Sequence, residues 1–271
     1  MMNNTDSENK ISELKEAAAV LDWDGTLRKG YEILDWTNFL EESGKFDRET
    51  AVRQRELVSN YLAGKIPYAQ AVFDVGVIYA EGIAGQKIED TLALAAQFAR
   101  IDKAIFGFTP AFLKILLNNN FRIVLISNTP QVMLDEYRKQ FGLTEVYGLQ
   151  VEQRAGLWAN RVIMNPGLSE VKRRIVTELV NKYKIILGMG DTHEDAPLLE
   201  AAKIRLFLKP ESKPNIRIPE VPELRVVDER FVIETVETAL AKIGAGSEMG
   251  ETDQRKPLTN EAMQRTSYGR C

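Results

Sequence analysis

Two aspartates at the end of an apolar run are the residues of this sequence whose types and spacing most clearly indicate chemistry. Asp22 and Asp24 follow the run at residues 17–21 and precede Gly25 and Thr26. Side chains two residues apart on an extended backbone point to the same side, so both carboxylates share one face. Crowded carboxylates repel each other unless a cation or a shared proton relieves them. The pair therefore predicts a site that holds a divalent metal and acts on an anion.

An ordinary turn is the alternative interpretation of this segment. Asp-Gly is a common turn pair, and Asp24 with Gly25 would be enough to close a hairpin. A second polar group argues against so local a role. Ser127 and Asn128 follow another apolar run and precede an expected helix, whose first amide groups can bind an anion. Ser127 could equally be a simple helix cap.

A third and a fourth group complete the candidate site. Asp191 and Asp195 stand four residues apart after the apolar run at residues 186–189, and Lys172 begins the helix expected before that run. Ligands of parallel sheets bind at the carboxyl ends of the strands, where all these groups would meet. Four acids with one lysine and a hydroxyl favour Mg²⁺ bound by oxygen ligands, with phosphate as a further ligand.

The elements that must position these groups are short, nearly continuous apolar runs separated by helical patterns. Continuous runs are typical of parallel strands that are covered by helices on both faces. The pattern predicts a doubly wound α/β sheet. The expected strands are Ala17–Leu21, Phe121–Ser127, Ile185–Met189 and Ile204–Leu208, and the expected helices are Pro110–Asn120, Pro130–Phe141 and Ser169–Tyr183. Thr109 and Thr129 are the expected caps of the first two helices.

Three segments depart from this alternation. Residues 31–104 contain helical patterns without a clear strand, and we expect them to form a small cap domain inserted into a core of residues 1–30 and 105–243. Residues 142–164 suggest a hairpin-like excursion. From residue 244 to residue 271 the chain is polar and short of aliphatic residues, which predicts a flexible tail.

Composition narrows the classes of function. With 35 basic and 39 acidic residues the net charge is −4, which gives no electrostatic case for nucleic acid as a partner. No apolar run is long enough to span a membrane. Cys271 is the one cysteine of the 271 residues, so an intrachain disulfide and a cysteine-based zinc site are excluded. A reducing cytoplasm fits this composition, and the sequence does not reveal the oligomeric state.

The four polar groups, taken in order, resemble the motifs of the haloacid dehalogenase superfamily, most of whose members are Mg²⁺-dependent phosphatases. The matching elements are the DxDGT segment at Asp22, an apolar run that ends in Ser-Asn-Thr, Lys172, and the GDxxxD segment at Asp191. The resemblance covers residues 17–208 and implies a Rossmann-like core. The helical segment resembles the cap of the subclass that includes the phosphoserine phosphatases.

The resemblance implies a role for each matching residue. Asp22 would take the phosphoryl group as an aspartyl phosphate. Asp24 would protonate the leaving group and then activate water. Ser127 and the Asn128 amide would bind phosphoryl oxygens, and Lys172 would offset negative charge.

The implied Mg²⁺ ligands are the carboxylates of Asp22 and Asp191 and the carbonyl of Asp24. Asp195 would be a further ligand or a residue that contacts the ligands. Asp195 could instead cap the helix that follows it. Lys172 could instead belong to a solvated basic face. His193 could act as a general base, but we favour its interpretation as a polar residue that lines the entrance to the site.

A small phosphorylated metabolite is the expected partner. Candidate cap residues that read its organic part are Tyr31, Glu32, Arg53 and Arg55, whereas Trp23 points away from both aspartates and is expected to pack. Phosphoserine phosphatases usually carry DxDST and SGG where this chain has DGT and SNT, which does not favour L-phosphoserine. A phosphotransferase or mutase on the same scaffold, or a non-catalytic binding module with this fold, are the alternative functions.

Overall fold

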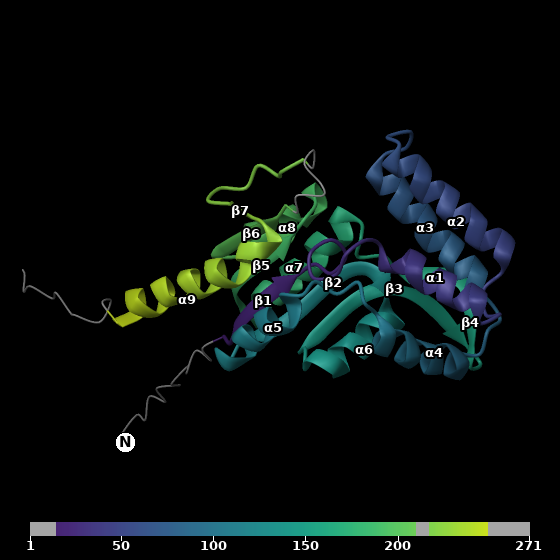
Figure 1. Ribbon diagram of the computed structural model, residues 1–271, viewed down its shortest axis with the longest axis horizontal. Coiled ribbons are helices and arrows are strands. Elements are labelled where there is room, and N and C mark those ends of the chain that lie inside the picture. Colours follow the sequence, from purple (N-terminus) through teal and green to yellow (C-terminus); the bar gives the residue numbers. More distant parts are fainter. Residues whose placement is uncertain (1–14, 210–216, 249–271) are drawn as a thin grey trace, which may run out of the picture.

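Seven strands form one sheet in the order β4-β3-β2-β1-β5-β6-β7 within the part of the chain that the structure describes (Figure 1). The structure is a computed structural model, and it describes residues 15–209 and 217–248. The central strands are parallel, as predicted from their continuous apolar runs. They are β1 (Ala17–Leu21), β2 (Arg122–Pro130), β5 (Lys184–Gly190) and β6 (Ile204–Leu208).

The remaining three strands widen the sheet at its two edges. Strand β3 (Glu145–Arg154) pairs in parallel with β2, and then turns at Gly156 into the antiparallel β4 (Leu157–Met164). These two strands are the hairpin that the sequence suggested, and they continue the main sheet. The short β7 (Arg225–Val227), which we did not predict, pairs with β6 at the other edge.

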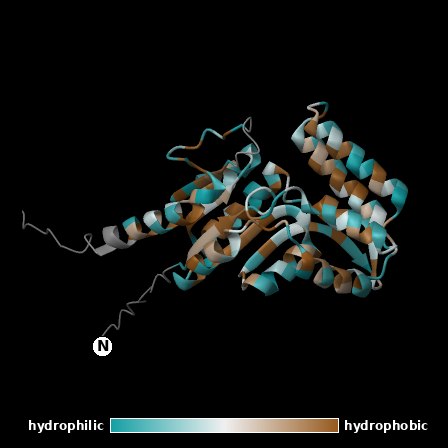
Figure 2. Cartoon of the chain, viewed as in Figure 1, coloured by the Kyte–Doolittle hydropathy of each residue, from teal (hydrophilic) through white to brown (hydrophobic). Residues whose placement is uncertain are grey.

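Helices cover both faces of this sheet, which confirms the doubly wound α/β class. Because successive side chains of a strand alternate between faces, Ala19 and Leu21 belong to one apolar cluster and Ala18 and Val20 to the other. Figure 2 shows hydrophobic residues in the strands and polar residues on the outer surfaces of the helices. Helices α5 (Thr109–Asn118), α6 (Gln131–Phe141) and α9 (Val232–Glu248) pack on the first face, and α7 (Ser169–Lys182) and α8 (Ala196–Ala201) on the second.

Four helices lie between β1 and α5 in the described chain. They are α1 (Glu32–Glu42), α2 (Arg48–Leu62), α3 (Tyr68–Ile83) and α4 (Ile88–Ile101). Helices α2 and α3 lie side by side at the end of the molecule opposite α9 (Figure 1). Side-chain hydrogen bonds tie this helical segment to the β3–β4 region. The Asn165 amide donates to the Val72 carbonyl at 3.0 Å, and the Trp158 indole donates to the Thr91 hydroxyl at 3.1 Å.

The two threonines that we expected to cap helices do not do so. The Thr109 hydroxyl donates to the Leu27 carbonyl at 2.7 Å, and the Thr129 hydroxyl donates to an Asp24 carboxylate oxygen at 3.0 Å. Neither α5 nor α6 has a side-chain cap. Both hydroxyls therefore hold the segment that follows β1, a long-range role that a local capping rule does not predict.

Helix α9 runs to Glu248 and so includes the first residues of the segment predicted as a tail. The rest of that segment, residues 249–271, lies outside the described residues. None of the helices in the described residues combines the length and the apolar character needed to cross a bilayer.

Candidate active site

The carboxyl ends of β2, β1 and β5 lie side by side and bring the predicted site residues together. Asp22 directly follows β1, and its backbone N–H donates to the Met189 carbonyl of β5 at 2.9 Å. Asp191 directly follows β5, and Ser127 lies near the carboxyl end of β2. This is the edge at which parallel sheets bind ligands.

Asp22, Asp191 and Asp195 form a buried cluster at this edge. Each contributes a carboxylate oxygen, and these oxygens all lie within 4.8 Å of one another. The three residues are 6%, 0% and 0% exposed. Burial raises the pKa of Asp22 well above its usual range, the charge of Lys172 opposes this shift, and the neighbouring aspartates reinforce it. Oxygen ligands so crowded and so buried fit a hard divalent cation such as Mg²⁺.

Lys172 reaches this cluster from α7 and is itself only 2% exposed. Its ammonium group donates to Asp195 Oδ1 at 2.5 Å and to Asp22 Oδ1 at 3.2 Å. Burial alone would lower the pKa of Lys172, but the two carboxylates more than offset burial and hold that pKa above its usual range. The ammonium group therefore stays charged beside Asp22, which does not support the alternative of a solvated basic face.

Asp195 is held at both carboxylate oxygens. Oδ2 accepts hydrogen bonds from the backbone N–H groups of Asp191 and Thr192 and from the Thr192 hydroxyl, at 3.0, 2.8 and 2.9 Å. Oδ1 accepts from Lys172. Gly190 leaves the room that this arrangement needs, because a Cβ there would lie 2.4 Å from the Asp195 Cβ. Asp195 thus orders the turn after β5 and fixes the position of Lys172.

The loop after β1 presses directly against Asp191. Gly25 adopts a φ of +81°, and a Cβ at that position would lie 2.1 Å from Asp191 Oδ2. The adjacent Thr26 hydroxyl lies 3.3 Å from Asp22 Oδ2 and 3.2 Å from Asp191 Oδ1. The Gly-Thr pair of the first motif therefore joins the two carboxylates that follow neighbouring strands.

The Asp24 carboxylate stands apart from the buried cluster but lines the same cavity as Asp22. Its Oδ1 accepts from the Glu32 N–H and its Oδ2 from the Thr129 hydroxyl, both at 3.0 Å. Burial raises the pKa of Asp24 to about 6, although the charge of Arg28 and these two hydrogen bonds act to lower it. The group therefore titrates close to neutral pH, which suits an acid that must also act as a base.

Ser127 and Asn128 line the cavity on the β2 side, as predicted from their place after an apolar run. The Asn128 Oδ1 atom is buried without a hydrogen-bond partner among the described residues. Gly167 packs against Asn128, since a Cβ at Gly167 would lie 2.7 Å from the Asn128 Cβ. The Ser127 hydroxyl can donate a hydrogen bond to a bound anion, whereas the unpartnered Asn128 oxygen is an acceptor and suits a donor such as a water molecule.

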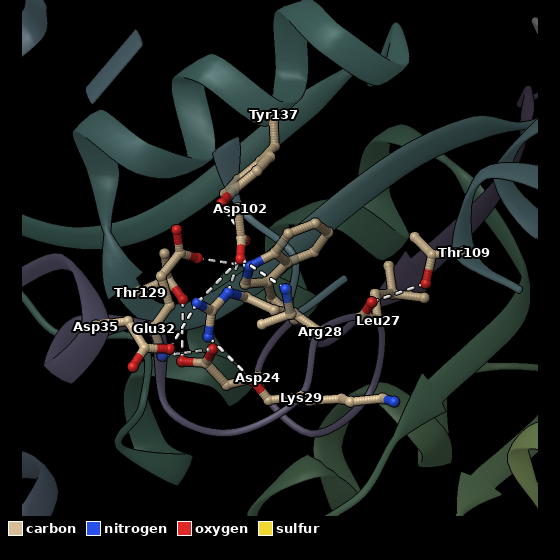
Figure 3. Close-up of polar contacts among 12 residues, drawn as sticks. Asp24, Leu27, Arg28, Lys29, Glu32, Asp35, Asp102, Thr109, Thr129 and Tyr137 are labelled. Carbon is tan, nitrogen blue, oxygen red and sulfur yellow. Dashed lines mark hydrogen bonds and ion pairs between the residues drawn. The ribbon is translucent and has the colours of Figure 1, made fainter. Parts of the chain in front are cut away.

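A charge network centred on the buried Arg28 lies next to Asp24 (Figure 3). The Arg28 guanidinium donates to Asp102 at 2.9 Å and to Asp35 at 2.7 Å, while the Tyr137 hydroxyl donates to Asp102 at 2.7 Å. Arg28 is 1% exposed. Because Arg28 and Asp102 come from either end of the helical segment, their ion pair closes that segment at its base, next to Asp24.

Sequence reasoning missed this network, since nothing in the local pattern around Arg28 or Asp102 distinguishes them from surface charges. The one available signal was the position of Arg28, two residues after the first motif. Trp23 was predicted correctly as a packing residue. It is fully buried, with its ring centroid 4.5 Å from that of Tyr137.

Of the four candidate cap residues, the structure places Tyr31 on the cavity. Glu32 is buried beneath it and accepts a hydrogen bond from the Trp23 indole at 2.6 Å. Arg53 pairs with Glu81 and Arg55 with Glu41, both away from the cavity lining. The interpretation of Glu32, Arg53 and Arg55 as substrate readers is therefore not supported. The exposed His193 is not among the described residues that line the cavity either.

Comparison with known proteins places this geometry in a family. The sequence model described as haloacid dehalogenase-like hydrolase matches residues 19–200, which include every predicted site residue. No curated protein matches the chain.

Several solved structures share the fold at low sequence identity. A protein of unknown function from Bordetella pertussis Tohama I is 21% identical with a TM-score of 0.60, over 72% of this chain and 90% of that one. A probable phosphoserine phosphatase from Vibrio cholerae is 14% identical with a TM-score of 0.59, over 87% of this chain and 67% of that one. A phospho-aspartyl intermediate analogue of phosphoserine phosphatase is 14% identical with a TM-score of 0.58, over 83% of this chain and 99% of that one.

Proposed function

The chain belongs to the haloacid dehalogenase-like hydrolase family, and from that premise we propose that it is a Mg²⁺-dependent phosphatase that hydrolyses a small phosphomonoester through an aspartyl phosphate. One observation carries the proposal. Asp22 lies in a buried contact with Lys172 and beside Asp191, at a cavity that Asp24 and Ser127 also line. Two of the similar structures bear the name phosphoserine phosphatase, which supports the same class of reaction.

Asp22 is the nucleophile in this proposal. One of its carboxylate oxygens attacks the phosphorus atom, and the bond from phosphorus to the substrate oxygen breaks. The Lys172 ammonium group, 3.2 Å from Asp22 Oδ1, favours the ionised carboxylate that the attack requires. It also offsets the negative charge of the transferring phosphoryl group.

Asp24 is the general acid and general base in this proposal. Its protonated form gives a proton to the departing alkoxide, and its ionised form then takes a proton from the water that hydrolyses the aspartyl phosphate. A pKa of about 6 makes both forms accessible near neutral pH. The hydrogen bonds from the Glu32 N–H and the Thr129 hydroxyl hold the carboxylate in one orientation through both steps.

Phosphoryl oxygens bind to Ser127 and the Asn128 amide in this account, as the order of the motifs implies. Both residues line the cavity beside Asp22. Phosphoryl transfer depends on positioning and on charge neutralisation, so hydrogen-bond donors held on a rigid strand end contribute directly to the rate.

The residues that would hold Mg²⁺ are Asp22, Asp191 and the Asp24 carbonyl, with Asp195 as a ligand or as the group that fixes Lys172. The crowding of three buried carboxylates supports this assignment, because the single charge of Lys172, which contacts Asp22 and Asp195, does not balance three carboxylates. Bound Mg²⁺ supplies positive charge that stabilises the negative charge of the transferring phosphoryl group.

The helices α1 to α4 form the cap in this proposal, with residues 31–104 as the cap domain and residues 1–30 and 105–243 as the core. Tyr31, Val58, Tyr61 and Val72 come from this segment and line the cavity with the core aspartates. A cap in this place excludes water from the reaction and contacts the organic part of the substrate. We place the reaction in the cytoplasm, in line with the single cysteine of the sequence.

Turnover of p-nitrophenyl phosphate tests the proposal. We expect Mg²⁺-dependent release of p-nitrophenol by the full chain, loss of that release in EDTA with recovery on added Mg²⁺, and no release by Asp22→Asn. Phe73→Ala, an exposed position on α3, is the matched control and is expected to behave as the unaltered protein. Turnover that survives both EDTA and Asp22→Asn would contradict the proposal.

A further inference from the structure

The cavity at the aspartates has two unlike sides. Its core side carries the charged groups Asp22, Asp24, Lys172 and Asp191. Among the described residues that line the cavity from the helical segment, none carries a charge. These residues include Tyr31, Val58, Tyr61, Tyr68, Val72 and Val75.

Three tyrosines from separate elements contact one another and line the cavity opposite the carboxylates. Tyr31 precedes α1 and is hydrogen-bonded to Tyr61 near the end of α2. The Tyr61 ring meets the Tyr68 ring edge to face, at a centroid distance of 5.7 Å and an interplanar angle of 71°. Burial and the negative charges of Asp195 and Asp22 raise the pKa of Tyr68 well above its usual range, so its hydroxyl stays neutral. The tyrosines therefore present uncharged aromatic surface to the cavity.

The three ionisable residues that the sequence suggested as readers of the substrate, besides Tyr31, are engaged elsewhere. The Glu32 carboxylate turns below the cavity toward the Trp23 indole. The guanidinium groups of Arg53 and Arg55 pair with Glu81 and Glu41. A substrate ammonium or carboxylate placed against these tyrosines and valines would lose hydration without a charged side chain of the helical segment to pair with, and burial of a charge without a direct partner is costly.

We propose that the substrate is the phosphate ester of an uncharged alcohol or phenol whose organic part is apolar or aromatic, and that Tyr61 and Tyr68 contact that organic part. The inference rests on the proposed phosphatase function and adds the class of leaving group. An aromatic ring or a short alkyl group gains contact with the tyrosine rings and the valines. The phosphoryl group alone then meets the charged side of the cavity.

A comparison of two esters tests the inference. We expect the kcat/KM of phenyl phosphate to exceed that of O-phospho-L-serine by at least about tenfold at equal Mg²⁺, because one buried charge without a partner costs more than the 1.4 kcal/mol that a tenfold preference represents. Calorimetry gives a readout without turnover. Phenylphosphonic acid should bind at least about tenfold more tightly than 2-amino-3-phosphonopropionic acid.

Variants at Tyr61 locate the contact. Tyr61→Ala should raise the KM of phenyl phosphate several-fold while inhibition by inorganic phosphate, which needs only the core side, stays the same. Tyr61→Phe should recover most of the lost affinity because it keeps the ring. Phe73→Ala removes an exposed ring from α3 and should change neither value.

The outcomes separate the two proposals. The inference is overturned if O-phospho-L-serine is hydrolysed as well as or better than phenyl phosphate, and 2-amino-3-phosphonopropionic acid binds as tightly as or more tightly than phenylphosphonic acid. That result would leave the phosphatase proposal intact. A parallel loss of inorganic phosphate inhibition in Tyr61→Ala would show that the ring only supports the structure, and would overturn its role as a contact. Failure to hydrolyse either ester would overturn the phosphatase function and this inference with it.

Discussion

Gly25 lies so close to Asp191 that any side chain at residue 25 would displace the carboxylate. A Cβ built on Gly25 would lie 2.1 Å from Asp191 Oδ2, and the residue also has a φ of +81°. The turn after β1 is therefore shaped around the carboxylate of Asp191, which follows the neighbouring strand β5. This contact links the first and last motifs of the sequence, 166 residues apart, at one point of the site.

Gly25→Ala is expected to lower Mg²⁺-dependent phosphatase turnover by about 10²-fold, because a displacement of about 1 Å at a reacting group has that effect. The measurement is kcat/KM with p-nitrophenyl phosphate. Gly30→Ala is the matched control, since Gly30 has a φ of +75° but a Cβ there meets nothing within 4 Å. Both variants carry the backbone strain of a positive φ, so equal turnover in the two would contradict the role of the Asp191 contact.

The ion pair of Arg28 with Asp102 is expected to matter far more for stability than an exposed pair of the same type. Both side chains are nearly fully buried, at 1% and 3% exposed. Arg28→Met leaves Asp102 buried without its cation and should lower the free energy of unfolding by about 3–5 kcal/mol. Urea denaturation measures the change.

Arg122 supplies the control for this prediction. It pairs with Glu16 at 2.6 Å, but the two side chains are 47% and 57% exposed. Arg122→Met should therefore lower the free energy of unfolding far less than Arg28→Met does, because solvent screens an exposed pair. A similar loss of unfolding free energy in the two variants would show that burial does not make the Arg28–Asp102 pair more important for stability than the exposed Arg122–Glu16 pair.

Glu32 should make the folded state less stable as the pH rises. Burial, reinforced by the charge of Asp24, raises the pKa of Glu32 from 4.5 to about 8. Between these values the folded protein keeps a proton that the unfolded chain has released, so the free energy of unfolding falls with increasing pH across this window. Glu32→Gln keeps the neutral form at every pH.

We therefore expect Glu32→Gln and the unaltered protein to have similar free energies of unfolding near pH 4.5, and the variant to be the more stable at pH 9. Urea denaturation across this range is the measurement. Glu42→Gln, at the exposed end of the same helix α1, is the matched control. A variant curve parallel to that of the unaltered protein would contradict a protonated, buried Glu32.

The parts of the fold that follow from local pattern were predictable from the sequence. Ala17–Leu21 and Ile204–Leu208 are continuous apolar runs, and such runs become buried parallel strands whatever their partners are. The convergence of Asp22, Asp191 and Lys172 was predictable as well, because the carboxyl ends of parallel strands share one edge.

The parts that depend on distant partners were not predictable. Thr129 has the type and position of a helix cap, but a long-range hydrogen bond to Asp24 takes its hydroxyl. Glu32 is charged and near the site, yet the packing of α1 turns it toward Trp23. The three-residue strand β7 is too short to carry a pattern, and it forms because β6 offers a free edge. In each case the deciding contact is with a residue that local sequence does not identify.

Chemical trapping of the phosphoryl group tests the central claim most directly. The enzyme is mixed with p-nitrophenyl phosphate and Mg²⁺, quenched in acid and reduced with borohydride, which converts an aspartyl phosphate to homoserine, and its peptides are then analysed by mass spectrometry. We predict homoserine at position 22 in the unaltered protein, and none in a sample quenched without substrate. Modification of a different residue, or turnover with an unmodified Asp22, would contradict the account.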